Sequence, residues 1–190
     1  MPIYVPKEIV ELTPTMESPL LFLAGPIRGG NDWQAEGAEE ILDQEPSAHI
    51  VCPSRWDKNH RLARHFYKPF TQAANRQLEF ERHYLRQAGI EPFVPGCVIF
   101  CLPCERTTDP HPGPEPYAMD TRREFGKFTA YCELMGVRMV VGGDRNFYGL
   151  DVMLYELNAA CEREVTFHTN MMDLVADALQ TARQRVSFLP

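Results

Sequence analysis

Residues 96–102 read Gly-Cys-Val-Ile-Phe-Cys-Leu and decide the fold, because they form the clearest strand pattern in the chain. Residues 20–24, Leu-Leu-Phe-Leu-Ala, make a second unbroken apolar run that ends in a Gly-Pro pair. Such runs are typical of strands buried on both faces of a parallel sheet. Three further predicted strands are shorter and lie at residues 49–52, 138–141 and 165–167.

Helical patterns fill the intervals between these strands. They lie at residues 33–42, 70–88, 121–135, 150–161 and 171–185, with caps expected at Asn31 (with Gln34) and Asn170 (with Asp173). Strands that alternate with helices predict an α/β fold, with a five-stranded parallel sheet and helices on both faces. We expect the flavodoxin-like strand order 2-1-3-4-5, in which the first and third strands are neighbours. Their carboxyl ends would border the crevice where ligands bind.

The composition indicates one globular domain, expected at residues 19–190, after an extended leader at residues 1–18 that contains three prolines. Nineteen basic against 26 acidic residues give a net charge of −7, which disfavours binding to a nucleic acid polymer or an anionic membrane. No apolar run approaches the roughly 20 residues that span a bilayer, and the leader does not resemble an export signal. The six cysteines fall among apolar residues, so we expect a location in the reducing cytoplasm.

The turn after the first strand, Gly25-Pro26-Ile27-Arg28-Gly29-Gly30, has neither the spacing of a dinucleotide-binding fold nor that of a P-loop. Its three glycines allow backbone amides to approach a ligand closely, and a guanidinium can contact two oxygens of a phosphate at once. The turn is therefore a candidate for substrate binding. The alternative is a tight connection with a solvated arginine.

The segment 120–126, Asp-Thr-Arg-Arg-Glu-Phe-Gly, opens the predicted helix that follows the third strand. Thr121 and Glu124 match a capping box, which is one interpretation of the pattern. The other is catalytic: Glu124 in the first turn of a helix at the crevice would be kept ionised by the helix amides, as a nucleophile requires. Arg122 and Arg123 would add positive charge there.

Glu81 lies on the apolar stripe of the 70–88 helix, three residues after Leu78 and four before Leu85. Burial would raise the pKa of this carboxyl and let it hold or deliver a proton near neutrality. An edge position that reaches water or pairs with a neighbouring arginine is the alternative.

Other candidate sites are weaker. None of the six histidines has the i, i+4 spacing of a helical zinc site, so we expect no metal and no cofactor. Cys101 and Cys104 have the spacing of a redox pair, but the first lies inside a predicted strand, which favours core packing. Trp33 and Trp56 follow the first two strands and are candidates for stacking on a planar base, with ordinary packing as the alternative.

At these residues the sequence resembles the nucleoside 2-deoxyribosyltransferase family, together with its relatives that hydrolyse nucleotide N-glycosidic bonds. The resemblance rests on four segments, at residues 21–26, 77–82, 98–100 and 121–126, and covers about residues 20 to 143. Two features depart from the family pattern: Leu21 stands where some transferases have a tyrosine, and the proline-rich loop at 103–119 is long.

The resemblance implies that Glu124, in Glu-Phe-Gly, is the nucleophile that attacks C1′ of the sugar. Glu81 falls where the family has an acidic residue at the base and sugar site. Asp120 would handle the proton on the base, with Asp109 as the alternative. The turn from Gly25 to Gly30 is similar to the family's first substrate loop, and its second half looks like the stretch with which the nucleotide hydrolases contact a 5′-phosphate.

The chemistry fits these residue types, since cleaving an N-glycosidic bond needs one carboxylate at C1′ and a second acid that helps the base depart. Glu124 is expected to stay ionised, whereas Glu81 or Asp120 would share a proton. We expect transfer of a 2-deoxyribosyl group from a nucleoside to another free nucleobase, by a homodimer or larger homo-oligomer. The alternatives are hydrolysis of a nucleoside 5′-monophosphate, a non-catalytic nucleotide-binding module in which Glu124 is only a cap and, more distantly, a thiol redox protein.

Overall fold

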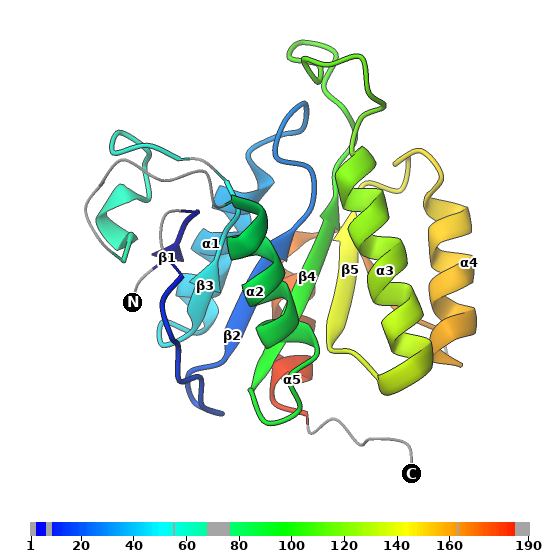
Figure 1. Ribbon diagram of the computed structural model, residues 1–190. Coiled ribbons are helices and arrows are strands. Elements are labelled where there is room, and N and C mark those ends of the chain that lie inside the picture. The colour runs from blue at the N-terminus through cyan, green and yellow to red at the C-terminus, as the bar shows by residue number, and fades with distance from the viewer. Residues whose placement is uncertain (1–2, 7–8, 55, 68–76, 163, 185–190) are drawn as a thin grey trace.

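The computed structural model describes residues 3–6, 9–54, 56–67, 77–162 and 164–184, and contains one parallel sheet flanked by helices (Figure 1). The strands are β1 (Ile3–Tyr4), β2 (Leu20–Ala24), β3 (His49–Val51), β4 (Gly96–Leu102), β5 (Met139–Gly143) and β6 (Phe167–His168). The helices are α1 (Trp33–Gln44), α2 (Gln77–Gly89), α3 (Met119–Met135), α4 (Leu150–Cys161) and α5 (Met171–Ala182), with a short 3-10 helix, η1, at Ala63–His65.

The sheet has six strands in the order β1-β3-β2-β4-β5-β6, so the predicted five-stranded sheet with order 2-1-3-4-5 is wrong. The difference is the edge strand β1, which forms within the expected leader and pairs in parallel with β3, Ile3 opposite Ile50 and Tyr4 opposite Val51. A two-residue strand is too short to leave a periodic pattern in the sequence. The α/β class and the parallel pairing are as expected.

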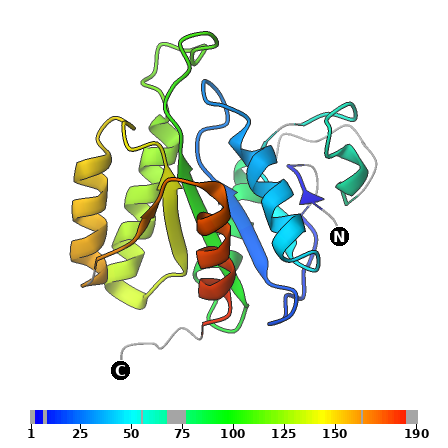
Figure 2. The ribbon, with the colours of Figure 1, turned by 180° about the vertical axis from the view of Figure 1, so that it is seen from behind.

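Each face of the sheet has its own apolar core. Leu20, Phe22 and Ala24 of β2 face α2, α3 and α4, which lie in front of the sheet in Figure 1. Leu21 and Leu23 face α1 and α5, which are in front when the molecule is seen from behind (Figure 2). All five side chains are at most 1% exposed. Burial of successive side chains on opposite faces is why the strand is apolar throughout.

Two helix starts differ from expectation. The N-cap of α1 is Asp32 instead of Asn31, and no side chain bonds to its first amides. α3 begins at Met119, two residues before the predicted start. By contrast, the expected cap of α5 is present, since the Asn170 side chain accepts a hydrogen bond from the amide of Asp173. Residues 70–76 of the predicted helix at 70–88 lie outside the described residues, and α2 is described from Gln77.

No helix among the described residues has both the length and the apolar character needed to cross a membrane.

Candidate active site

A cavity of about 530 Å³ opens at the carboxyl end of β2, next to the loop that follows β4. These neighbouring strands continue in different directions, since β2 leads to α1 behind the sheet and β4 leads to α3 in front of it (Figures 1 and 2). The walls come from the turn after β2, the first turns of α2 and α3, and the proline-rich loop between β4 and α3. The expected site residues that line the cavity are Gly25, Pro26, Ile27, Arg28, Glu81, Asp120 and Glu124.

The glycine turn is tightly enclosed at two positions. A Cβ on Gly25 would lie 2.3 Å from the Cys101 carbonyl oxygen and 2.6 Å from the Trp33 ring. Gly29 has a φ of +80°, and a Cβ there would lie 2.8 Å from the backbone nitrogen of His111. Only glycine fits such positions without displacing the backbone beside it. The turn is therefore fixed on one side by β4 and on the other by the proline-rich loop.

α3 starts without the predicted capping box. Its N-cap is Ala118, with a φ of +59° and no side-chain cap, and Thr121 is buried within the helix. The chain enters the helix early because the turn before it is already closed: the Met119 amide bonds to the Pro116 carbonyl, and the Tyr117 hydroxyl donates to the Pro103 carbonyl at 2.9 Å. Glu124 consequently sits in the second turn, where its side chain faces the cavity instead of the helix amides.

The environment of Glu124 favours its neutral form. Burial, followed by the negative charges of Glu81 and Asp120, raises the pKa of this carboxyl from 4.5 to about 7, against a smaller lowering by Lys127. The expectation that helix amides keep Glu124 ionised is therefore wrong. The prediction that Glu81 or Asp120 shares a proton stays a prediction.

Glu81 reaches the same cavity from α2. Its Oε1 accepts a hydrogen bond of 2.7 Å from the Gln77 side chain one turn earlier, and the residue is partly buried. Leu78 also lines the cavity and is 75% exposed, whereas Leu85 is buried against the sheet. The stripe on which Glu81 lies thus faces the cavity at Leu78 and the apolar core at Leu85. Glu81 is neither buried in the core nor fully solvated.

The third carboxylate, Asp120, is at the rim. Its side chain is 89% exposed and lies 3.4 Å from the Arg123 guanidinium. Arg122 lies outside the cavity: it donates a 2.6 Å hydrogen bond to the Tyr148 carbonyl, and its guanidinium lies over the Phe147 ring at 4.5 Å. Arg122 therefore joins α3 to the segment before α4 and is not placed to contact a ligand in the cavity.

No protein-family model and no curated protein matches the chain. The chemistry available to the cavity is set by the side chains that line it. Four carboxylates, an arginine and a histidine surround a space with apolar walls at Ile27 and Leu78. Burial, with the charges of Glu81 and Asp120, raises the pKa of one of the carboxyls, Glu124, to about 7. A carboxylate in this state can act as a nucleophile or as a proton carrier.

The two tryptophans do not line the cavity. Trp33 is 1% exposed, and its indole N–H donates a hydrogen bond of 2.9 Å to the Pro26 carbonyl. Trp33 therefore packs in the core and stabilises the glycine turn. Trp56 stacks on the imidazole of His60 with ring centroids 4.2 Å apart. Gly29 and Gly30 face the proline-rich loop and also lie outside the cavity wall. The proposed stacking of a base on Trp33 or Trp56 therefore finds no support in this geometry.

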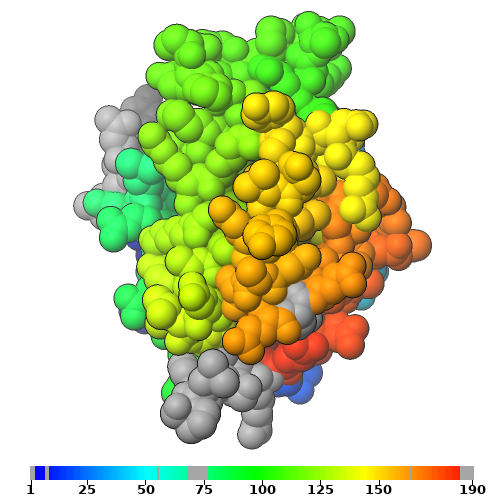
Figure 3. All heavy atoms as spheres, turned by 90° about the vertical axis from the view of Figure 1, so that its right-hand side faces the viewer, coloured from blue at the N-terminus to red at the C-terminus, as the bar shows by residue number. Residues whose placement is uncertain are grey.

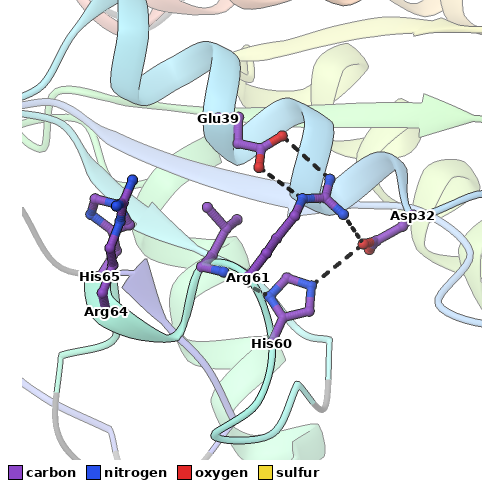
Figure 4. A network of polar contacts seen from close by, with 7 residues as sticks. Asp32, Glu39, His60, Arg61, Arg64 and His65 are labelled. Carbon is purple, nitrogen blue, oxygen red and sulfur yellow. Dashed lines mark hydrogen bonds and ion pairs between the residues drawn. The ribbon is translucent and has the colours of Figure 1, made fainter.

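The segment after β3 is attached to α1 by a small ionic network (Figure 4). Arg61 donates to Glu39 at 2.8 Å and to Asp32 at 2.9 Å. The imidazole Nε2 of His60 lies 3.4 Å from the Asp32 carboxylate, and the pKa of Glu39 is lowered chiefly by its hydrogen bond from Arg61. These contacts join the segment that carries Trp56 to α1.

Sequence reasoning missed the cavity residues of the predicted loop at 103–119, which are His111, Glu115, Pro116, Ala118 and Met119. The length of that loop was the only signal available, since its residues follow no periodic pattern.

Neither a metal centre nor a redox pair is indicated. Among the residues that the structure describes, no three His, Cys, Asp or Glu side chains are grouped as metal ligands. Burial raises the pKa of Cys101 to about 12, and burial followed by a hydrogen bond to Asp144 raises that of Cys104. Thiols in this state are poor nucleophiles.

Proposed function

We propose that the protein cleaves the N-glycosidic bond of a (deoxy)nucleoside and transfers the 2-deoxyribosyl group to another base. The observation that carries this proposal is the position of Glu124, whose carboxyl faces a cavity shared with Glu81 and the glycine turn. The interpretation of Glu124 as a mere helix cap has lost its basis, because α3 starts five residues earlier in the chain.

The reaction follows a double displacement. An oxygen of ionised Glu124 forms a bond to C1′ while the C1′–N bond breaks. The electron pair of the C1′–N bond leaves with the base, and the base gains a proton. A nitrogen of a second base then attacks C1′ and loses its proton, and the bond to Glu124 breaks. The carboxylates of Glu81 and Asp120 stabilise the positive charge on the sugar in both transition states. Water in place of the second base gives hydrolysis.

Base exchange tests the proposal. The protein is incubated with a 2′-deoxynucleoside and a different, isotopically labelled free base, and the labelled nucleoside is measured. We expect exchange by the unaltered protein, none by Glu124→Gln, and full exchange by Glu133→Gln, which removes an exposed carboxylate from the same helix. An acid-quenched sample of the unaltered protein should carry the mass of one deoxyribosyl group. Equal exchange by the Glu124 variant contradicts the assignment.

A second candidate is hydrolysis of a nucleoside 5′-monophosphate, which Arg28 favours. This exposed arginine lines the cavity in the glycine turn, and a guanidinium contacts phosphate oxygens in pairs. Release of base and sugar phosphate from a monophosphate, with a KM that rises in Arg28→Gln for the monophosphate but not for the nucleoside, would favour this reaction over transfer.

The homodimer or larger assembly stays a prediction. α3 and α4 lie on the side that Figure 3 presents. Four exposed apolar side chains lie in or beside these two helices: Leu134, Tyr148, Val152 and Tyr155. Sedimentation of the unaltered protein and of Tyr155→Glu would test whether copies associate through this face.

A further inference from the structure

We infer that His111 is the general acid that protonates the departing base, an inference that rests on the proposed cleavage of an N-glycosidic bond. Among the described residues, the ionisable side chains that line the cavity are Arg28, Glu81, His111, Glu115, Asp120 and Glu124. A purine or pyrimidine leaves C1′ readily only when one of its nitrogens or oxygens is protonated as the bond breaks. One of these side chains must carry that proton.

The carboxylates expected to do so are poorly placed. Asp120 is 89% exposed and lies beside the Arg123 guanidinium at the rim of the cavity, where its side chain faces solvent. Asp109 is exposed and outside the cavity wall. Glu124 is committed to bond formation at C1′, and Glu81 lies next to it, as its effect on the pKa of Glu124 shows. The remaining candidates for the proton donor lie in the proline-rich loop.

The loop holds His111 firmly against the glycine turn. The amide of Arg106 donates to the Gly29 carbonyl at 2.6 Å, and the amide of His111 donates to Glu105 Oε1 at 2.8 Å. The absence of a side chain at Gly29 lets the backbone of His111 come this close, since a Cβ there would lie 2.8 to 3.1 Å from three of its atoms. A residue held in this way keeps a fixed position relative to the cavity.

Glu115 lines the same cavity, four residues after His111 in the proline-rich loop. The Nε2 of His111 and the Oε2 of Glu115 lie 3.0 and 2.6 Å from the position that a Cβ on Gly113 would occupy, so both side chains pass the same face of Gly113. The other charged groups around this part of the cavity are Arg28 of the glycine turn, Glu81 of α2 and Asp120 of α3.

The proton balance is complete without a further reactant. The imidazolium of His111 gives its proton to the base while Glu124 bonds to C1′, and the neutral imidazole then accepts the proton that the second base or water loses. Histidine suits this exchange because its side chain ordinarily changes charge between pH 5 and 8.

The leaving group supplies the test. An N7-methylated purine deoxynucleoside releases its base without a proton, whereas the unmethylated nucleoside needs one. We expect His111→Gln to lower kcat on the unmethylated substrate by about 10²- to 10⁴-fold and on the methylated one by less than about threefold. His83→Gln, which removes an exposed histidine of α2 outside the cavity, should match the unaltered protein on both.

A second measurement, the pH dependence of kcat, applies to any nucleoside or monophosphate that the protein turns over. In the unaltered protein kcat should fall at alkaline pH as the acid loses its proton, and His111→Gln should lack that fall. Equal losses on both methylated and unmethylated substrates with an unchanged alkaline limb overturn the assignment, as does a rise in KM for monophosphates alone. Full turnover by Glu124→Gln, or no release of base by the unaltered protein, instead overturns the proposed function.

Discussion

Replacing Glu124 by glutamine should stabilise the folded protein at alkaline pH. In the unfolded chain this carboxyl loses its proton near its ordinary pKa of 4.5, whereas in the folded protein burial and the charges of Glu81 and Asp120 raise the pKa to about 7. Between these two values the unfolded state binds fewer protons. Stability is therefore lost as the pH rises from 4.5 to 7, and the full cost is present above pH 7.

The size of the effect follows from the difference in pKa. At about 1.4 kcal/mol per pKa unit, ionisation of Glu124 costs the folded state about 3 kcal/mol at pH 8.5 and nearly nothing at pH 4. Glutamine has nearly the same shape and never ionises. We therefore compare the free energy of unfolding of Glu124→Gln with that of the unaltered protein at each pH. The difference in favour of the variant should be about 3 kcal/mol larger at pH 8.5 than at pH 4.

Urea unfolding followed by tryptophan fluorescence at several pH values measures this difference. Comparing each variant with the unaltered protein at the same pH cancels the titration of all other groups. Glu133→Gln is the matched control, because it removes an exposed carboxylate from α3 without relieving a buried charge. A stability difference for Glu124→Gln that stays constant with pH, or that shrinks toward pH 8.5, would refute the burial of an ionisable carboxyl at this position.

Three further predictions concern activity and the glycine turn. With Glu124 as nucleophile, kcat/KM should rise about tenfold per pH unit below pH 7, before the alkaline fall that the proton donor causes, as a pH–rate profile would show. Glu81→Gln should move that acidic limb to lower pH, and Asp120→Asn should move it less, since Glu81 contributes the larger charge repulsion; an unmoved limb in both variants would contradict the shared cavity. Gly29→Ala should lower the free energy of unfolding by about 1–3 kcal/mol and reduce turnover, because its Cβ would meet the backbone of His111; denaturant curves and assays at one temperature check both effects.

The sequence predicted the central strands because these strands are buried on two faces. Residues 20–24 and 96–102 contact an apolar core on each side of the sheet, so burial requires an apolar side chain at every position. β1 has no comparable run of apolar residues. Ile3 and Tyr4 form a strand because β3 offers them a free edge, which is a property of the folded sheet and not of the segment itself.

For the site, the sequence predicted which residues reach the cavity better than it predicted their state. Glu124 and Arg28 lie where a turn and a helix follow neighbouring parallel strands, so topology alone brings them together. The protonation of Glu124 could not be predicted, because it depends on burial and on Glu81, which comes from another helix. His111 was missed because its place is set by hydrogen bonds of the loop to Gly29 and Glu105.

The raised pKa of Glu124 also bears on how the cavity would act in catalysis. Burial, followed by the negative charges of Glu81 and Asp120, disfavours the ionised form of this carboxyl. A sugar that gains positive charge at C1′ reverses the sign of the charge interaction, since each carboxylate then attracts the reacting centre. The same charges that disfavour ionised Glu124 thus stabilise the transition state more than the ground state, which is the condition for lowering the barrier. By this reasoning Glu81→Gln should lower the pKa of Glu124 and yet slow the chemical step, a combination that a purely structural role of Glu81 would not produce.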